Sequence, residues 1–131
     1  MGGENLFIEG TVTGGFGEGA VFMSVGHYKN EIKKKLGFDA YPGTLNLKVS
    51  KSQPDLLKSA NQIKIEGFIS KGRKFGGAAC YKAKIRNING AVIVPEITKQ
   101  EKGIIEFIAP FHLKSKLKLK DGDKIKIELE K

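Results

Sequence analysis

The chain has 131 residues, of which 40% are hydrophobic and 28% are charged, and its formal net charge at pH 7 is +9. This length and composition are typical of one soluble globular domain, which we expect to span residues 1–131. No apolar stretch approaches the roughly eighteen residues that a membrane helix needs. The N-terminus also lacks the basic and apolar regions of a signal peptide, so we expect a cytoplasmic protein with no membrane partner.

The first part of the chain predicts two strands around a glycine-rich loop, followed by a helix. Residues 6–12 and 20–24 are rich in strand-forming residues, and the glycines of the loop lie between them, within 14–19. From 28 to 36 the pattern becomes helical, because apolar residues recur at every fourth position. Gly37 follows directly, as is typical of a helix C-terminus.

The rest of the chain predicts further short strands separated by turns. We expect strands at 45–49, 63–69, 78–85, 91–95, 104–109 and 124–129, short helices at 54–60 and 111–117, and turns at 71–74, 87–90 and 121–122. About seven or eight short strands with only short helices favour a mainly β fold, a compact β-barrel.

The single cysteine, Cys80, excludes an internal disulfide and a cysteine-rich zinc site. Nothing in its surroundings indicates a nucleophile. We therefore expect Cys80 to be a buried structural residue.

The positive charge leaves two interpretations open. The 23 Lys and Arg residues outnumber the 14 Asp and Glu residues, and a basic domain attracts the phosphates of nucleic acids. A protein that binds one nucleoside triphosphate is also basic. Only Arg73 and Arg86 are arginines, the residues most used to read bases. Charge alone does not choose between the two.

The glycine-rich loop has the composition of a phosphate-binding loop. It consists of Gly15, Phe16, Gly17, Glu18, Gly19 and Ala20. Glycines let backbone N–H groups approach phosphate oxygens closely. The spacing also fits a dinucleotide-binding fingerprint, but that motif must open a helix, and a strand is expected here. A glycine loop between two strands, as in protein kinases, is the nearer analogue, and a plain glycine turn is the alternative.

A tight turn at Pro42-Gly43 presents a second candidate site. Proline followed by glycine suits the centre of a type II turn. If the following residues are extended, Thr44 and Asn46 point to the same face, and their oxygens could share one Mg²⁺. Both ligands are neutral, so the phosphates of a nucleotide would have to supply negative charge. The alternative is a turn with ordinary polar residues.

Taken together, these motifs make the chain resemble the archaeal CTP-dependent riboflavin kinases over nearly its whole length. The resemblance is carried by Glu9-Gly10, Gly15-Phe16-Gly17-Glu18-Gly19, Leu36-Gly37-Phe38, Tyr41-Pro42-Gly43-Thr44-Leu45-Asn46, Val94-Pro95, Thr98, Ile104-Ile105-Glu106-Phe107-Ile108-Ala109-Pro110 and Leu119-Lys120-Asp121-Gly122-Asp123. It implies a cradle-loop (RIFT-type) six-stranded β-barrel with short peripheral helices. It also implies a riboflavin kinase domain that converts riboflavin and CTP to FMN and CDP with Mg²⁺.

The resemblance also implies roles for individual residues. The nucleotide loop falls on Gly15 to Ala20, the metal ligands on Thr44 and Asn46, the flavin contacts on Thr98 and Glu106, and a second nucleotide segment on Phe111, His112, Leu113 and Lys114. Glu106 is the carboxylate expected to contact the transferring hydroxyl, as base or as orienter. Two positions differ from the family pattern. Some relatives have a basic residue where this chain has Ala20, and proline is usual where it has Ala40.

Two other functions remain open at this point. One is a DNA-binding regulator of the swapped-hairpin barrel type, which the charge and the segment from Leu119 to Ile125 would suit. A regulator of this type does not require the glycine loop, nor Thr44 and Asn46. The other is a flavin- or nucleotide-binding module without turnover. On the kinase interpretation we expect a monomer that does not bind nucleic acid.

Overall fold

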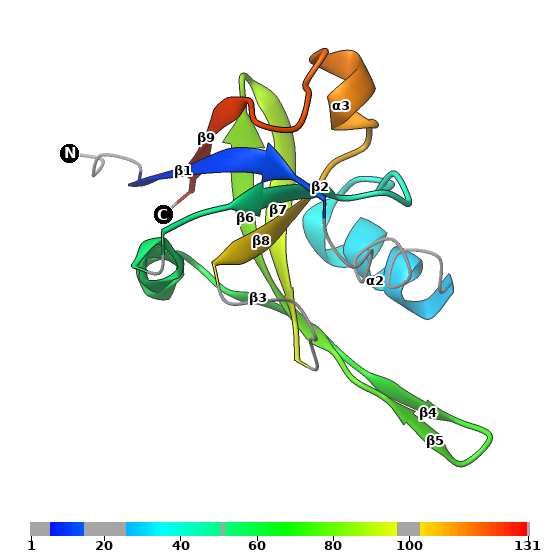
Figure 1. Cartoon of the computed structure of the whole chain (residues 1–131). Helices are drawn as coiled ribbons and strands as arrows, with labels where there is room; N and C mark the ends of the chain where they lie inside the picture. The colour runs from blue at the N-terminus through cyan, green and yellow to red at the C-terminus, as the bar shows by residue number, and fades with distance from the viewer. Residues whose placement is uncertain (1–5, 15–25, 51, 97–102, 131) are drawn as a thin grey trace.

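The computed structural model describes residues 6–14, 26–50, 52–96 and 103–130 (Figure 1). The described elements are β1 (Leu6–Thr13), α2 (Gly26–Leu36), β2 (Leu45–Lys48), the 3₁₀ helix η1 (Gln53–Ser59), β3 (Ile63–Ile65), β4 (Phe68–Ser70), β5 (Arg73–Phe75), β6 (Ala78–Ile85), β7 (Ile88–Pro95), β8 (Ile104–Ile108), α3 (Leu113–Lys116) and β9 (Lys124–Leu129). None of the described helices has the length and apolar character required to span a lipid bilayer.

Six of the strands close into an antiparallel barrel in the order β6-β7-β8-β2-β1-β9, with β9 returning to β6. The closing contact is short, because only Ala83 and Lys84 of β6 pair with β9. Between β1 and β9, in contrast, six consecutive residue pairs run from Leu6–Leu129 to Thr11–Lys124. The expected six-stranded β-barrel with few short helices is confirmed.

Two apolar layers hold this barrel together. Inward-pointing residues of the strands fill its interior, and Ile8, Leu47 and Ile127 are completely buried there. A second layer lies outside the barrel, where Tyr28 and Ile32 of α2 pack in one cluster with buried residues of β6, β7 and β8. The helical spacing read from the sequence therefore marks the face of α2 that contacts the barrel.

Cys80 lies in the outer layer, under α2, and is completely buried. Burial disfavours the thiolate and raises the pKa of the Cys80 thiol to about 12. We expect iodoacetamide at pH 8 to leave Cys80 unmodified in the folded protein and to alkylate it fully in guanidinium chloride. Mass spectrometry of the intact chain measures both. Rapid alkylation of the folded protein would mean that α2 readily leaves the barrel.

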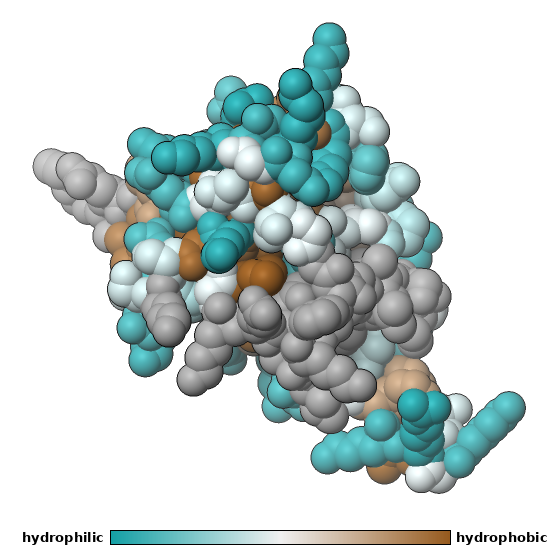
Figure 2. All heavy atoms as spheres, viewed as in Figure 1, coloured by the Kyte–Doolittle hydropathy of each residue, from teal (hydrophilic) through white to brown (hydrophobic). Residues whose placement is uncertain are grey.

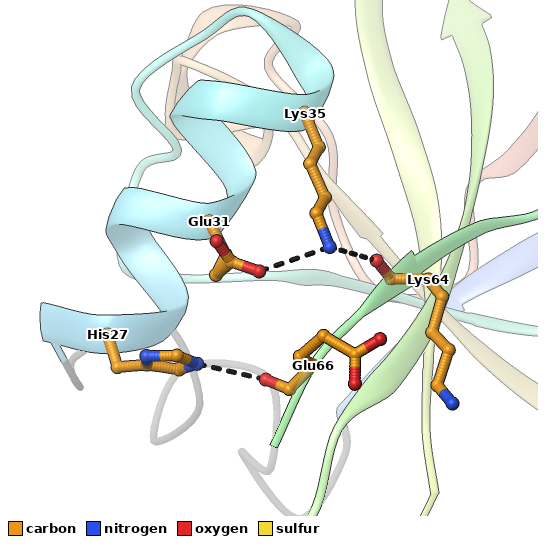
Figure 3. A network of polar contacts seen from close by, with 5 residues as sticks. All are labelled: His27, Glu31, Lys35, Lys64 and Glu66. Atoms are coloured by element: carbon orange, nitrogen blue, oxygen red, sulfur yellow. Dashed lines mark hydrogen bonds and ion pairs between the residues drawn. The ribbon is translucent and has the colours of Figure 1, made fainter. Parts of the chain in front are cut away.

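A polar network joins α2 to the chain around β3 (Figure 3). The Nε2 atom of His27 donates to the carbonyl oxygen of Glu66 at 3.0 Å. The ammonium group of Lys35 donates to the carbonyl oxygen of Lys64 at 2.8 Å and lies 3.1 Å from the Glu31 carboxylate. The hydrogen bond from Lys35 lowers the pKa of Glu31. Each end of the helix is thus tied to the same stretch of backbone.

The strand expected over 63–69 is broken in two. The chain bends at Gly67, where a Cβ atom would lie only 2.2 Å from the carbonyl oxygen of Phe75. Beyond the bend, β4 and β5 form a separate two-stranded ribbon that extends away from the barrel and ends in hydrophilic residues (Figures 1 and 2). The turn expected at 71–74 is shorter, and consists of Lys71 and Gly72, both with positive φ.

The hairpin between β6 and β7 also turns earlier than expected. The turn was predicted at 87–90, but it consists of Arg86 and Asn87, which have φ angles of +46° and +70°. Two residues with positive φ are what a two-residue hairpin loop requires. Gly90 lies within β7 instead, where a Cβ atom would be 2.2 Å from the carbonyl oxygen of Ile108. This glycine permits close packing rather than a turn.

Candidate active site

Thr44, Asn46 and Glu106 lie at one point on the barrel. Asn46 of β2 is directly opposite Glu106 of β8. The hydroxyl of Thr44, just before β2, donates a hydrogen bond to Oε1 of Glu106 at 2.8 Å. Asn46 and Glu106 both point out of the barrel, because side chains alternate along a strand and their neighbours Leu45 and Phe107 point inward. The predicted metal ligands Thr44 and Asn46 therefore lie next to Glu106, the carboxylate predicted to contact the transferring hydroxyl.

Glu106 is the one buried charged side chain among the described residues, with 2% of its surface exposed. On the side away from Asn46 its neighbour is Ile93, which belongs to the layer beneath α2. Burial of an ionised carboxylate is unfavourable unless hydrogen bonds replace its water. The Thr44 hydroxyl supplies one such bond, and this bond fixes the direction of the carboxylate.

The chemistry of this group fits a hard divalent cation. A hydroxyl, an amide and a carboxylate offer oxygen ligands, which Mg²⁺ prefers. Because the Thr44 hydroxyl donates its hydrogen bond to Glu106, the lone pairs of its oxygen face away from the carboxylate and are oriented to bind a cation. No group of three or more His, Cys, Asp or Glu side chains with the arrangement of a metal site occurs in the described part of the chain, and this group contains only one such side chain.

The turn that presents Thr44 is attached to the end of β8. The backbone N–H of Tyr41 donates to the carbonyl oxygen of Ala109 at 2.8 Å. The ring of Tyr41 folds over Gly43, where a Cβ atom would lie 3.1 Å from Cε1 of that ring. Gly43 does not adopt the positive φ that the predicted type II turn requires, so that turn type is not formed. Its lack of a Cβ atom permits the close packing of Tyr41. The backbone contact between Tyr41 and Ala109 sets the position of Thr44 relative to β8.

The second predicted nucleotide segment reaches the same place. A small hollow lies between it and the turn, lined by Gly43, Thr44, Leu45, Phe107, Phe111, His112, Leu113 and Lys114. The rings of Tyr41 and His112 lie 5.2 Å apart between centroids, and Phe111 is exposed. Leu113 is buried in the barrel core and anchors the segment. The segment and the Thr44 turn therefore form opposite walls of one hollow.

Two polar contacts orient the side chains of this wall. The Nδ1 atom of His112 lies 2.7 Å from the hydroxyl of Ser115. The ammonium group of Lys114 donates to Asp121 at 2.8 Å. No sequence pattern pairs Asp121 with Lys114, because the contact depends on how the chain folds back after α3. It holds the Lys114 cation at the rim of the hollow.

Several expected site residues lie outside the described part of the chain. They are the loop residues Gly15, Phe16, Gly17, Glu18, Gly19 and Ala20, the strand expected at 20–24, and Thr98. One neighbour of the site was missed. Thr13, the last residue of β1, is directly opposite Asn46 and on the same outer face. Alternation after the buried Val12 predicts that Thr13 points outward, but only the strand register places it beside Asn46.

Comparisons with known proteins identify the family of this chain. The family model described as "CTP-dep_RFKase: Domain of unknown function DUF120" matches residues 12–129. A relative from Methanosarcina acetivorans named riboflavin kinase is 42% identical over 129 residues, which cover 96% of this chain and 54% of that protein. Riboflavin kinases from Pyrobaculum islandicum and Saccharolobus solfataricus are 43% and 41% identical, over 95% of this chain and 61% and 74% of theirs.

This chain therefore spans little more than half the length of several relatives it matches. The matched region nevertheless runs from the end of β1 to the end of β9. It includes both walls of the hollow and the strands that bring Asn46 and Glu106 together. The chain belongs to the family of CTP-dependent riboflavin kinases.

Proposed function

We propose that this chain is a CTP-dependent riboflavin kinase that transfers the γ-phosphate of CTP to the terminal ribityl hydroxyl of riboflavin. Family membership supports this proposal, and relatives of similar sequence are named riboflavin kinase. The observation that carries it is the buried Glu106 carboxylate, hydrogen-bonded to Thr44 and opposite Asn46. A phosphotransferase needs an acceptor-orienting group and a site of charge neutralisation next to each other, and these residues provide both.

The reaction requires little covalent help from the protein. The ribityl hydroxyl oxygen forms a bond to the γ-phosphorus, while the bond from that phosphorus to the oxygen bridging to the β-phosphate breaks. CDP leaves, and the hydroxyl proton passes to the carboxylate of Glu106. The hydrogen bond from Thr44 holds this carboxylate in one orientation, so that the acceptor oxygen is presented in line with the bond that breaks.

Thr44 and Asn46 would hold Mg²⁺, which neutralises charge on the phosphates when it is bound. Both side chains are neutral, so the phosphates must contribute much of the affinity. The backbone of Gly15 to Ala20 and the segment from Phe111 to Lys114 would contact the nucleotide, and Thr98 would contact the flavin. Lys114, held by Asp121 at the rim of the hollow, adds positive charge near the phosphates.

Thr44→Val and Asn46→Leu are each expected to lower turnover by about a hundredfold at limiting Mg²⁺, because each removes an oxygen ligand of the cation. Thr44→Ser is the matched control, since it keeps the hydroxyl and the hydrogen bond to Glu106. Initial rates over a Mg²⁺ titration, with thermal melts to check folding, measure the effect. Near-normal activity of both variants at limiting Mg²⁺ would contradict the metal assignment.

Product analysis tests the proposed function itself. The purified chain is incubated with riboflavin, Mg²⁺ and either CTP or ATP, and FMN is separated by chromatography. We expect FMN with CTP and little with ATP. A preference for ATP would contradict the donor. Binding of riboflavin or CTP without FMN under all conditions would indicate a ligand-binding module and overturn the kinase.

A further inference from the structure

A second surface of the barrel, on the outer side of β2, β1, β9 and β6, is strongly basic. We call it the basic face, and its charged residues are Lys48, Lys84, Arg86, Lys124 and Lys126 with Glu9 and Glu128. The strand register places these side chains in rows. Thr11 of β1 lies between Lys48 of β2 and Lys124 of β9. Neighbouring strands are about 4.8 Å apart, so these two lysines start about 10 Å apart on either side of the Thr11 hydroxyl.

The two carboxylates of the basic face do not neutralise it. Glu9 lies 3.8 Å from the ammonium group of Lys126, and Glu128 lies 3.9 Å from that of Lys84. Both distances are long, and both pairs are reached by solvent, so each attraction is weak. Within the described residues, Lys48, Lys124 and Arg86 make no ion pair. An excess of positive charge is therefore available to an anionic partner.

The face is also hollowed, and it carries an aromatic ring. Two hollows, of about 390 and 320 Å³, lie side by side and share Lys124, Ile125 and Lys126 in their linings. Phe7 borders the second hollow and has 49% of its surface exposed. The ammonium group of Lys126 lies 5.8 Å from the centre of its ring. Figure 2 shows mostly hydrophilic residues over β1 and β9.

We propose that the basic face binds single-stranded nucleic acid, with phosphates on Lys48, Lys124 and Arg86 and an unpaired base stacked on Phe7. Single-strand binding proteins combine two elements: cations that line a groove, and exposed aromatic rings on which bases stack. The basic face has both. The strand is single because bases within a duplex already stack on one another and offer no face to Phe7. The kinase interpretation of the sequence led us to expect no nucleic acid, although charge alone left that question open. The strand register now places the lysines of the basic face in rows.

This surface is distinct from the proposed kinase site but adjoins it. Lys48 follows Asn46 by two residues on β2, so the two side chains share the outer face. The proposal does not depend on kinase activity. It does require that nucleic acid and CTP bind at different places, and this can be tested by competition.

Fluorescence anisotropy with a labelled 12-nucleotide single strand, as DNA and as RNA, tests the proposal. Contacts to three phosphates predict that log affinity falls with log salt with a slope of about −2. Phe7→Ala is expected to weaken binding about tenfold, the usual size of one lost stacking contact. The double variant Lys48→Ala/Lys124→Ala, which removes two of the proposed phosphate contacts, should weaken it at least as much and reduce the salt slope. Lys29→Ala/Lys34→Ala, which removes two exposed lysines of α2, is the matched control and should bind like the unaltered chain.

Several results would overturn this proposal. Absence of binding at 50 mM salt would do so, as would equal losses in the two lysine variants, which would indicate unspecific attraction to net charge. Unchanged affinity of Phe7→Ala, or equally tight binding of a duplex, would exclude stacking of an unpaired base. Displacement of the strand by saturating CTP and Mg²⁺ would place the nucleic acid in the nucleotide site. FMN formation by the Phe7 and lysine variants, measured in parallel, should be unchanged.

Discussion

Glu106→Gln is expected to lower kcat for FMN formation by about a hundred- to ten-thousandfold, the range for loss of a group that accepts a proton. The amide has nearly the shape of the carboxylate, and its oxygen can still accept the hydrogen bond from Thr44. The fold and the KM for riboflavin should therefore change little. Steady-state rates with varied riboflavin, together with thermal melts, separate an effect on kcat from effects on binding and folding.

Glu130→Gln is the control for this experiment, because Glu130 is an exposed carboxylate beyond the end of β9. It should behave as the unaltered chain does. A Glu106→Gln variant that keeps its kcat but has a raised KM would mean that the carboxylate only positions riboflavin. One that keeps both values would remove Glu106 from the proposed mechanism.

The largest effect on stability is expected from Gly90→Ala, which should lower the free energy of unfolding by about 3 kcal/mol or more. The added methyl group would lie 2.2 Å from the carbonyl oxygen of Ile108 and 2.7 Å from the ring of Phe107. Phe107 is buried in the barrel interior, so neither neighbour can move without disturbing the pairing of β7 with β8. Urea unfolding followed by circular dichroism measures the change.

Gly26→Ala is the matched control, because a Cβ atom on Gly26 would meet no atom within 4 Å. Alanine also favours the helix more than glycine does, so this variant should be as stable as the unaltered chain or slightly more stable. If Gly90→Ala were equally well tolerated, the strands β7 and β8 would have to separate there at little cost.

Local patterns in the sequence predicted those parts of the structure that depend on local spacing. Apolar residues at every fourth position predicted α2 and the face that it buries, and alternation predicted that Thr44 and Asn46 share one side of a strand. No local pattern shows that Glu106 is their neighbour. Thr44 and Glu106 are 62 positions apart, and their contact follows from the register of β2 against β8. The sequence suggested Thr44, Asn46 and Glu106 as separate site residues, and only the pairing of β2 with β8 shows that they are neighbours.

The predicted boundaries of the turn between β6 and β7 are wrong because two residues there have roles that their residue types rarely have. Asn89-Gly90 has the composition of a hairpin turn, yet Gly90 is needed where two strands approach closely. Arg86 takes a positive φ, which its type rarely adopts, because the pairing of Ile85 with Ile88 leaves two residues for the turn. These requirements come from contacts between distant parts of the chain, so a reading of neighbouring residues does not reveal them.

The pairing of β1 with β9 has a consequence for how the chain acquires its fold. These strands come from opposite ends of the described sequence, yet six residue pairs join them, whereas only two pairs join β9 to β6 where the barrel closes. During synthesis β1 leaves the ribosome first and has no partner on that edge until β9 has been made. Such distant contacts slow folding, and an unpaired strand edge favours association with other chains. We therefore expect folding in milliseconds to seconds, and nascent chains that end before Lys124 to remain open and prone to aggregate.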